Sequence, residues 1–305
     1  MDKTTGGWLN GFLGVLIFSG SLPATRAAVM DFDPVFLTVA RATIAALLGI
    51  ALLLAAREKL PERGDVPSLV VVAIGVVVGY PLLTALALQH ITSAHSIVFV
   101  GLLPLATAIF GVLRGGERPR AAFWLFSCVG SALVVGYAVG QGLPRDSLRV
   151  ALPFGHAPSG LSASPTGDML MLAAIVICGL GYAEGAKLSR KLGGWQVICW
   201  ALALSLPLML VLFVMLAPPS FSNVGTPAWL GLAYVSLFSM LIGFVFWYRG
   251  LAQGGIAAVG QLQLLQPFFG LALAATLLGE QVSVGMLAVT LAVVACVVGA
   301  KRLAA

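Results

Sequence analysis

Apolar runs of about 20 residues alternate along this chain with short breaks that contain charged residues, glycine or proline. A helix needs about 20 apolar residues to cross the hydrocarbon layer of a membrane. The pattern therefore predicts ten membrane-spanning helices, at about residues 8–26, 34–56, 66–89, 92–113, 119–139, 168–190, 195–217, 227–249, 256–278 and 282–301. Typical breaks are Asp31 to Pro34, Gly193-Gly194 and Gly254-Gly255. The predicted fold class is an all-α polytopic membrane protein.

One long segment occurs twice, at an offset of 163 residues. Residues 256–280 fall on residues 93–117, so that Pro267 meets Pro104 and both copies end in Gly-Glu. A repeat of this length indicates a duplicated unit. The sequence thus predicts two related halves, with a working site where they meet.

The ten spans divide into two sets of five around one long connection. Residues 1–139 form the predicted first five-helix repeat, residues 140–167 a flexible linker rich in proline, glycine and serine, and residues 168–305 the second repeat. Because five is an odd number, the second repeat would enter the membrane inverted relative to the first. Inverted repeats of this kind place a binding site near the midplane and support alternating access.

Composition and charge agree with this arrangement. The chain has 305 residues, of which 60% are apolar and 9% charged, and its mean hydropathy is +1.04. Thirteen of the 17 Lys and Arg residues fall on the side of the two termini. Since basic residues gather in cytoplasmic loops, both termini are predicted to be cytoplasmic and the linker periplasmic, in a bacterial inner membrane. The same rule accounts for the net charge of +6 without a nucleic-acid partner.

The spans, the five-plus-five duplication and the proline-centred fourth and ninth spans that end in Gly-Glu resemble the EamA-type drug/metabolite transporter superfamily. Its local marks here are Ala94, Pro104 and Gly116-Glu117, with their counterparts Ala257, Pro267 and Gly279-Glu280. Within it, the chain most resembles the bacterial amino-acid exporters, particularly those for aromatic amino acids. The resemblance implies a central cavity lined mainly by spans three, four, eight and nine, with contributions from one and six. The implied partners are the lipid bilayer and small molecules: amino acids and other small amphipathic metabolites.

Span nine carries two glutamines on one helical face, because Gln263 and Gln266 lie three residues apart. An amide both donates and accepts hydrogen bonds, which suits a zwitterionic substrate. Alternatively, these amides hold helices together. Gln261 points about 200° away from Gln263 on an ideal helix, so both cannot face one cavity.

Spans three and four supply further candidates. Tyr80 and Thr84 lie near the middle of span three, beside Pro81, where a proline can bend the helix. His95, at the outer mouth of span four, is a candidate gate or proton-sensitive residue, or else an interfacial histidine bonded to a carbonyl. Ser96 and Phe99 follow it on the same span.

Span six contains Tyr182 and Glu184, the one carboxylate well inside a predicted span. A carboxylate at lipid depth is a candidate for proton coupling or for binding an amine. A local ion pair with Lys187 or Arg190 explains Glu184 equally well, and His95 is the other coupling candidate.

The remaining candidates are aromatic or basic. Trp200 and Tyr234 add aromatic surface to the predicted site, whereas Trp247 and Tyr248 approach the cytoplasmic interface, where an aromatic belt is expected. Arg41, two turns into span two, either meets a substrate carboxylate or extends to the lipid headgroups, and we favour the headgroups.

Pro81, Pro104 and Pro267 are the predicted hinges of an amino-acid exporter that works by alternating access. No nucleotide-binding loop, dinucleotide fingerprint or metal-ligand spacing occurs, so we expect no cofactor, no metal and no enzymatic activity. The alternatives are a multidrug exporter of organic cations that uses a buried carboxylate and a non-transporting receptor or scaffold. Whether the protein is a monomer or a dimer stays open.

Overall fold

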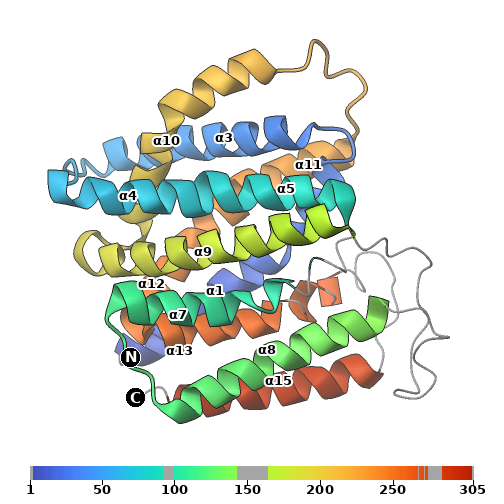
Figure 1. The fold of residues 1–305 in the computed structure, drawn as a ribbon. Helices are drawn as coiled ribbons and strands as arrows, with labels where there is room; N and C mark the ends of the chain where they lie inside the picture. The colour runs from blue at the N-terminus through green and yellow to red at the C-terminus, as the bar shows by residue number, and fades with distance from the viewer. Residues whose placement is uncertain are drawn as a thin grey trace.

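The computed structural model describes residues 3–91, 96, 99–142, 164–266, 268–270, 272–273 and 284–303. Over these ranges the chain is helical and contains no strand (Figure 1). In the first half the helices are α1 (Lys3–Ser19), α2 (Ser21–Ala28), α3 (Pro34–Ala55), the short η1 (Arg63–Asp65), α4 (Val66–Val72), the π-helix η2 (Ala73–Gly79), α5 (Tyr80–His90), α7 (Leu103–Gly115) and α8 (Ala121–Gly142). In the second half they are α9 (Pro165–Leu192), α10 (Gly194–Leu216), α11 (Thr226–Tyr234), the π-helix η4 (Val235–Ile242), α12 (Gly243–Gly254), α13 (Ile256–Gly260), the 3₁₀ helix η5 (Gln261–Leu265) and α15 (Val284–Leu303).

Six continuous helical stretches in the described part are long and apolar enough to cross a membrane. They are Thr4–Ala28, Pro34–Ala55, Arg63–His90, Pro165–Leu192, Gly194–Leu216 and Thr226–Gly254. Shorter apolar helices occupy Leu103–Gly115, Ala121–Gly136 and Leu291–Ala300. The all-α membrane class is thus confirmed. The count of ten spans stays a prediction, because spans four and nine run through residues outside the described part.

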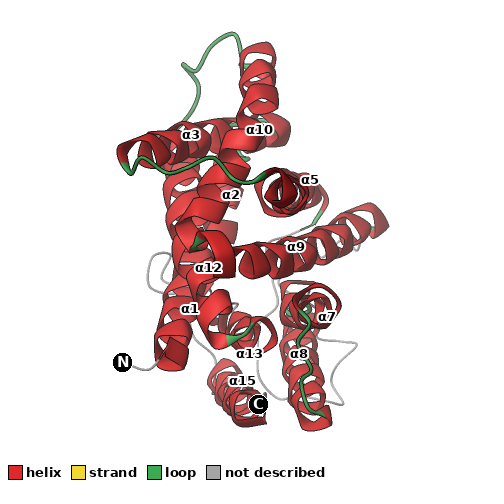
Figure 2. Ribbon diagram, turned by 90° about the vertical axis from the view of Figure 1, so that its left-hand side faces the viewer, coloured by secondary structure: helices red, strands yellow, loops and turns green. Residues whose placement is uncertain are grey.

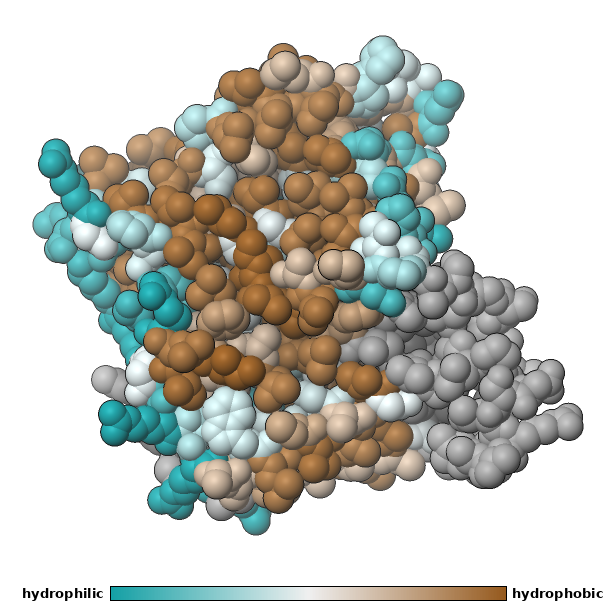
Figure 3. All heavy atoms as spheres, in the orientation of Figure 1, coloured by the Kyte–Doolittle hydropathy of each residue, from teal (hydrophilic) through white to brown (hydrophobic). Residues whose placement is uncertain are grey.

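Large apolar side chains cover the outside of the bundle. Leu54, Met215 and Leu291 are each more than 70% exposed, and Figure 3 shows an apolar band between hydrophilic ends. In water such a surface would be a large liability. In lipid it is the expected exterior, since a helix satisfies its own backbone hydrogen bonds.

The two halves share one core. Helices of the first half pack along helices of the second: α1 on α12, α3 on α10, and both α5 and α7 on α9 (Figure 2). The largest hydrophobic cluster accordingly contains buried residues from both halves. The start of α1 and the end of α15 lie at the same end of the bundle, which we call the termini end (Figure 1).

The two π-helices occupy equivalent positions in the predicted repeat. Shifting Ala73–Gly79 by the 163-residue offset gives residues 236–242, which lie within Val235–Ile242. π-Helical turns are rare and frequently occur at functional sites. Here they give spans three and eight the same local irregularity, which supports a structural duplication.

Glycine permits a close crossing between η2 and α9. A Cβ atom built on Gly75 would lie 2.9 Å from the Gly181 Cα and 2.9 Å from the Ile177 carbonyl oxygen. Such close helix contacts through small residues are typical of membrane bundles. The missing side chains of Gly75 and Gly181 therefore let these two helices approach each other closely.

We expect Gly75→Ala to destabilise the protein by about 1–3 kcal/mol, the usual effect of overpacking. The neighbouring atoms are backbone atoms that cannot turn away. Thermal unfolding of the purified protein in detergent measures the loss. Gly136→Ala is the matched control, because a Cβ there would have no neighbour within 4 Å. Equal melting temperatures for the two variants would contradict the packing argument.

Candidate functional site

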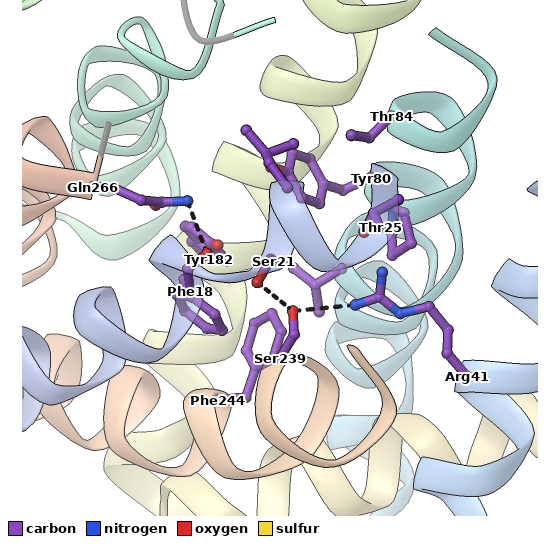
Figure 4. Close-up of a pocket in the computed structure, with 13 residues that line it drawn as sticks. Phe18, Ser21, Thr25, Arg41, Tyr80, Thr84, Tyr182, Ser239, Phe244 and Gln266 are labelled. Carbon is purple, nitrogen blue, oxygen red and sulfur yellow. Dashed lines mark hydrogen bonds between the residues drawn. The ribbon is translucent and has the colours of Figure 1, made fainter. Parts of the chain in front are cut away.

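A cavity lies between the two halves and receives side chains from spans one, two, three, six, eight and nine (Figure 4). The space between atoms there, part of it open to solvent, is about 490 Å³. Span two contributes Arg41, which the predicted lining did not include. Much of the outer part of span four lies outside the described residues, so its part in the lining stays a prediction. The lining residues are Phe18, Ser21, Leu22, Thr25, Arg41, Val76, Tyr80, Pro81, Thr84, Tyr182, Ser239, Phe244 and Gln266.

The two π-helices meet at this cavity. Val76 on η2 and Ser239 on η4 both line it, and these positions are related by the same 163-residue offset. Pro81 and Phe244, which follow the two π-helices, are also related by that offset and also line it. The cavity therefore lies where equivalent parts of the two predicted repeats face each other.

Aromatic rings form much of the cavity wall. The ring centroids of Phe18 and Phe244 lie 5.1 Å apart in an edge-on arrangement, and those of Tyr182 and Phe244 lie 5.9 Å apart. Tyr80 adds a fourth ring from α5. Rings in mutual edge contact are held in place by their neighbours, so this wall presents a fixed apolar surface to a bound molecule.

Three polar side chains form a chain of hydrogen bonds at the cavity, beside Phe244 (Figure 4). Arg41 donates from a terminal guanidinium nitrogen to Ser239 Oγ at 3.2 Å, and Ser21 Oγ donates to the same oxygen at 2.8 Å. Ser239 Oγ accepts both bonds, which leaves its own proton for a further acceptor. Gln266 donates from Nε2 to the Phe18 carbonyl oxygen at 3.4 Å.

The cavity includes four of the predicted binding residues, Tyr80, Thr84, Tyr182 and Gln266, together with the predicted hinge Pro81.

The other described candidates lie outside the cavity lining. Gln263 is fully buried, and no described group lies within hydrogen-bond distance of its amide. Tyr234 donates its hydroxyl to the Ile17 carbonyl oxygen at 2.6 Å, just before the break between α1 and α2. Trp200 is half-buried on α10.

The predicted residues of span four divide between described and undescribed positions. Ser96 is buried, Phe99 is half-buried, and the hinge candidate Pro104 is buried in the first turn of α7. His95, and with it the hinge candidate Pro267 of span nine, lie outside the described residues.

Glu184 is fully buried near the termini end, away from the cavity lining. Its carboxylate accepts from Ser68 Oγ at 2.6 Å and from Arg114 Nε at 2.8 Å, and Lys187 Nζ lies 3.5 Å away. Of the two interpretations of this residue, the contacts favour the ion pair.

Two sequence expectations placed side chains at the membrane surface, and both are wrong because these side chains lie inside the bundle. Arg41 is only 7% exposed and lines the cavity, so it does not extend to the headgroups. Trp247 and Tyr248 are fully buried against the cavity wall and are not part of an interfacial belt. For Arg41 a signal was available: it shares a helical face with Thr38, Ala45 and Gly49, whose small side chains permit contact with other helices.

The Gly116-Glu117 sequence that ends span four makes a structural contact with span nine. The Glu117 carboxylate accepts from the backbone N–H groups of Ile256 at 2.6 Å and of Ala257 at 2.7 Å. These are the first residues of α13, after Gly255 with its φ of 93°. A carboxylate at a helix N-terminus satisfies unpaired donors and interacts favourably with the helix dipole. The end of span four thereby caps the start of span nine.

Further polar contacts at the termini end also join the two halves. Arg190 lies 3.2 Å from Glu117, and Lys191 contacts Glu62 at 2.7 Å and Asp65 at 2.9 Å. Together with the Glu184 and Glu117 contacts, they connect the two halves at this end of the bundle. Among the described residues, no cluster of His, Cys, Asp or Glu could hold a metal ion.

Comparisons with known proteins agree with this architecture. A model described as the EamA-like transporter family matches residues 5–137 and 165–300. The "Uncharacterized transporter YdeK" of Bacillus subtilis (strain 168) is 66% identical over 304 residues, which is 100% of both chains. A solved structure named only as "Crystal structure of protein" aligns with a TM-score of 0.70 over 98% of this chain and 97% of its own, at 23% identity. At that identity the likeness shows the fold alone.

We expect Glu117→Ala to lower stability by about 0.5–2 kcal/mol, the usual effect of removing a helix cap. The variant leaves two backbone donors at the start of α13 without their acceptors. The measurement is thermal unfolding in detergent, with Glu62→Ala as the control because the Glu62 side chain is 76% exposed. A loss no greater than that of the control would show that the cap contributes nothing.

Proposed function

This chain belongs to the EamA-like transporter family, and we propose that it exports amino acids, aromatic ones included, by alternating access. It is a multi-pass membrane protein of a transporter family, and its partners are the lipid bilayer and a small-molecule substrate. The proposal places it in a bacterial inner membrane with both termini in the cytoplasm.

The observation that carries the proposal is the aromatic wall of a cavity enclosed between the two halves. Tyr80, Tyr182, Phe18 and Phe244 offer ring faces and edges to an apolar side chain, and bury it without binding it covalently. Ser21, Thr25, Ser239 and Gln266 bring hydroxyl and amide groups to the same space. Such a site holds an amphipathic molecule with one apolar end and one polar end.

Alternating access is supported by the position of the closing contacts. We take the polar contacts that join the halves at the termini end to close the cavity on the side predicted to be cytoplasmic. If the second half is an inverted copy of the first, the conformation that opens this end is the counterpart of the one observed. Pro81, Pro104 and Pro267 are the proposed hinges, and Gln263, one turn from Gln266 toward the start of span nine, is a proposed contact in that second conformation.

The alternative of an organic-cation exporter requires a carboxylate in the cavity. No Asp or Glu is among the described lining residues, and Glu184 is already bonded to Ser68 and Arg114. The described lining therefore favours a substrate that is not a simple cation. Because it contains no carboxylate, it also favours uncoupled transport.

The proposal is tested with purified protein in liposomes loaded with labelled phenylalanine. We expect efflux above that of protein-free liposomes, slowed by unlabelled amino acids and indifferent to an imposed pH gradient. Tyr80→Ala should slow phenylalanine efflux roughly tenfold, since a lost aromatic contact is worth up to about 1.5 kcal/mol, whereas Tyr80→Phe should retain most of it. Export of organic cations in place of amino acids would refute the assignment.

A second variant separates the two candidate functions. Glu184→Gln should leave the substrate selectivity and the pH independence of efflux unchanged, while it lowers the melting temperature, because the Arg114 ion pair is lost. The control is Glu62→Gln, which changes an exposed carboxylate of the same end. Complete loss of transport by a Glu184→Gln protein that remains folded would instead favour the cation exporter.

A further inference from the structure

Arg41 is a buried cation for which the described part of the chain provides no counter-ion. Its residue is 7% exposed, and its single hydrogen bond to a described group goes to the neutral hydroxyl of Ser239 at 3.2 Å. The buried Nε atom has no described partner. Among the described residues, no carboxylate forms an ion pair with this guanidinium, although the carboxylates of Glu184, Glu117, Glu62 and Asp65 all do so with other basic residues.

Such an arrangement is costly at lipid depth. A guanidinium stays protonated in proteins, and an enclosed charge is stable only when it is paired and hydrogen-bonded. Charged side chains inside membrane spans are for this reason rare and typically mark substrate or ion pathways. An anion that enters the cavity would remove this cost, and the vacant donors of Arg41 are the groups that would bind it.

The fold itself does not require a charge at this position. The residue at the 163-residue offset is Leu204 on α10, which is 45% exposed. Likewise, Ser239, which accepts the hydrogen bond from Arg41, has Val76 as its counterpart. Each half thus has an apolar side chain where the other half places the cation or the hydroxyl, so packing alone does not explain the polar pair.

We propose that Arg41 and Ser239 bind the carboxylate of the transported molecule, and that the substrates of this protein are organic carboxylates with an apolar or aromatic side chain. This inference rests on the proposed transport function and narrows it. Guanidinium groups present several N–H donors in a planar fork that matches a carboxylate. The free proton of Ser239 Oγ adds a neutral donor beside them.

The rest of the cavity fits the other parts of such a molecule. The rings of Phe18, Tyr182 and Phe244 provide the apolar wall. An ammonium group, where the substrate has one, meets hydroxyls, the Gln266 amide and ring faces, since the described lining contains no acidic residue. Recognition of the carboxylate is therefore the stronger requirement, and recognition of the amine the weaker one.

The test compares three ligands of one shape with the purified full-length chain. Phenylalanine carries both end groups, 3-phenylpropanoate lacks the amine, and phenylalaninamide lacks the carboxylate. Binding is measured in detergent as ligand-induced thermal stabilisation, and transport as competition with labelled phenylalanine in liposomes. We expect phenylalanine and 3-phenylpropanoate to stabilise the protein and phenylalaninamide to bind at least about tenfold more weakly, because it lacks the charge-assisted contact.

The variants are Arg41→Gln, Arg41→Lys and the control Arg26→Gln. Arg26 is an exposed arginine of α2 that donates to the Leu88 carbonyl and does not line the cavity. We expect Arg41→Gln to abolish the preference for carboxylates over the amide, Arg41→Lys to retain part of it, and Arg26→Gln to behave as the unmodified protein. The ligand comparison on the unmodified protein remains decisive even if a variant fails to fold.

The possible outcomes separate this inference from the proposed function. Arg41-dependent binding of 3-phenylpropanoate without amino-acid transport would refute amino-acid export and support the carboxylate site. Amino-acid transport in which phenylalaninamide competes as well as phenylalanine would support export and overturn the carboxylate site. Failure of both carboxylates to stabilise the protein, or unchanged selectivity in Arg41→Gln, would also overturn it.

Discussion

A charge enclosed at lipid depth must be compensated by the protein around it, and this constraint explains where the polar groups of the chain lie. The helices satisfy their own backbone hydrogen bonds and present leucine and methionine to the outside. Buried polar side chains are then confined to the interior of the bundle. The charge of Glu184 is compensated there by Arg114 and Ser68. The charge of Arg41 faces the cavity, where its one described partner is the neutral Ser239 hydroxyl.

The shape of the cavity follows from how the two halves interlock. Helices of one half pack on helices of the other, and the glycine crossing of η2 with α9 brings span three close to span six. The π-helices η2 and η4 interrupt the regular periodicity of two facing spans, so that Val76 and Ser239 both point into the space between them. The cavity therefore lies beside irregular π-helical turns, between helices that otherwise pack closely.

Hydropathy was enough to predict the helical class and most helix positions, because lipid requires long apolar helices whatever their side chains do. It was also enough to indicate four of the cavity residues, Tyr80, Thr84, Tyr182 and Gln266, since polar groups in apolar spans face inward. The direction of a single long side chain could not be predicted in this way. Arg41 lies two turns from the start of its helix. From that position its long side chain can extend either toward the headgroups or into the cavity, and hydropathy does not distinguish the two directions. Nor could composition show that Trp247 and Tyr248 pack inward, because interfacial belts and buried clusters use the same residues.

The closing contacts at the termini end differ in kind from the core contacts. The basic partners Arg114, Arg190 and Lys191 have side chains that are 42% to 48% exposed. Where the acidic partner is exposed as well, as in the Lys191–Glu62 pair, such a contact contributes about 0–1 kcal/mol. In the alternating access that we propose, this end of the bundle would open by exchanging such polar contacts for water. The two halves also share an apolar core, so such an opening must rearrange apolar contacts between helices of the two halves as well as the polar contacts at this end.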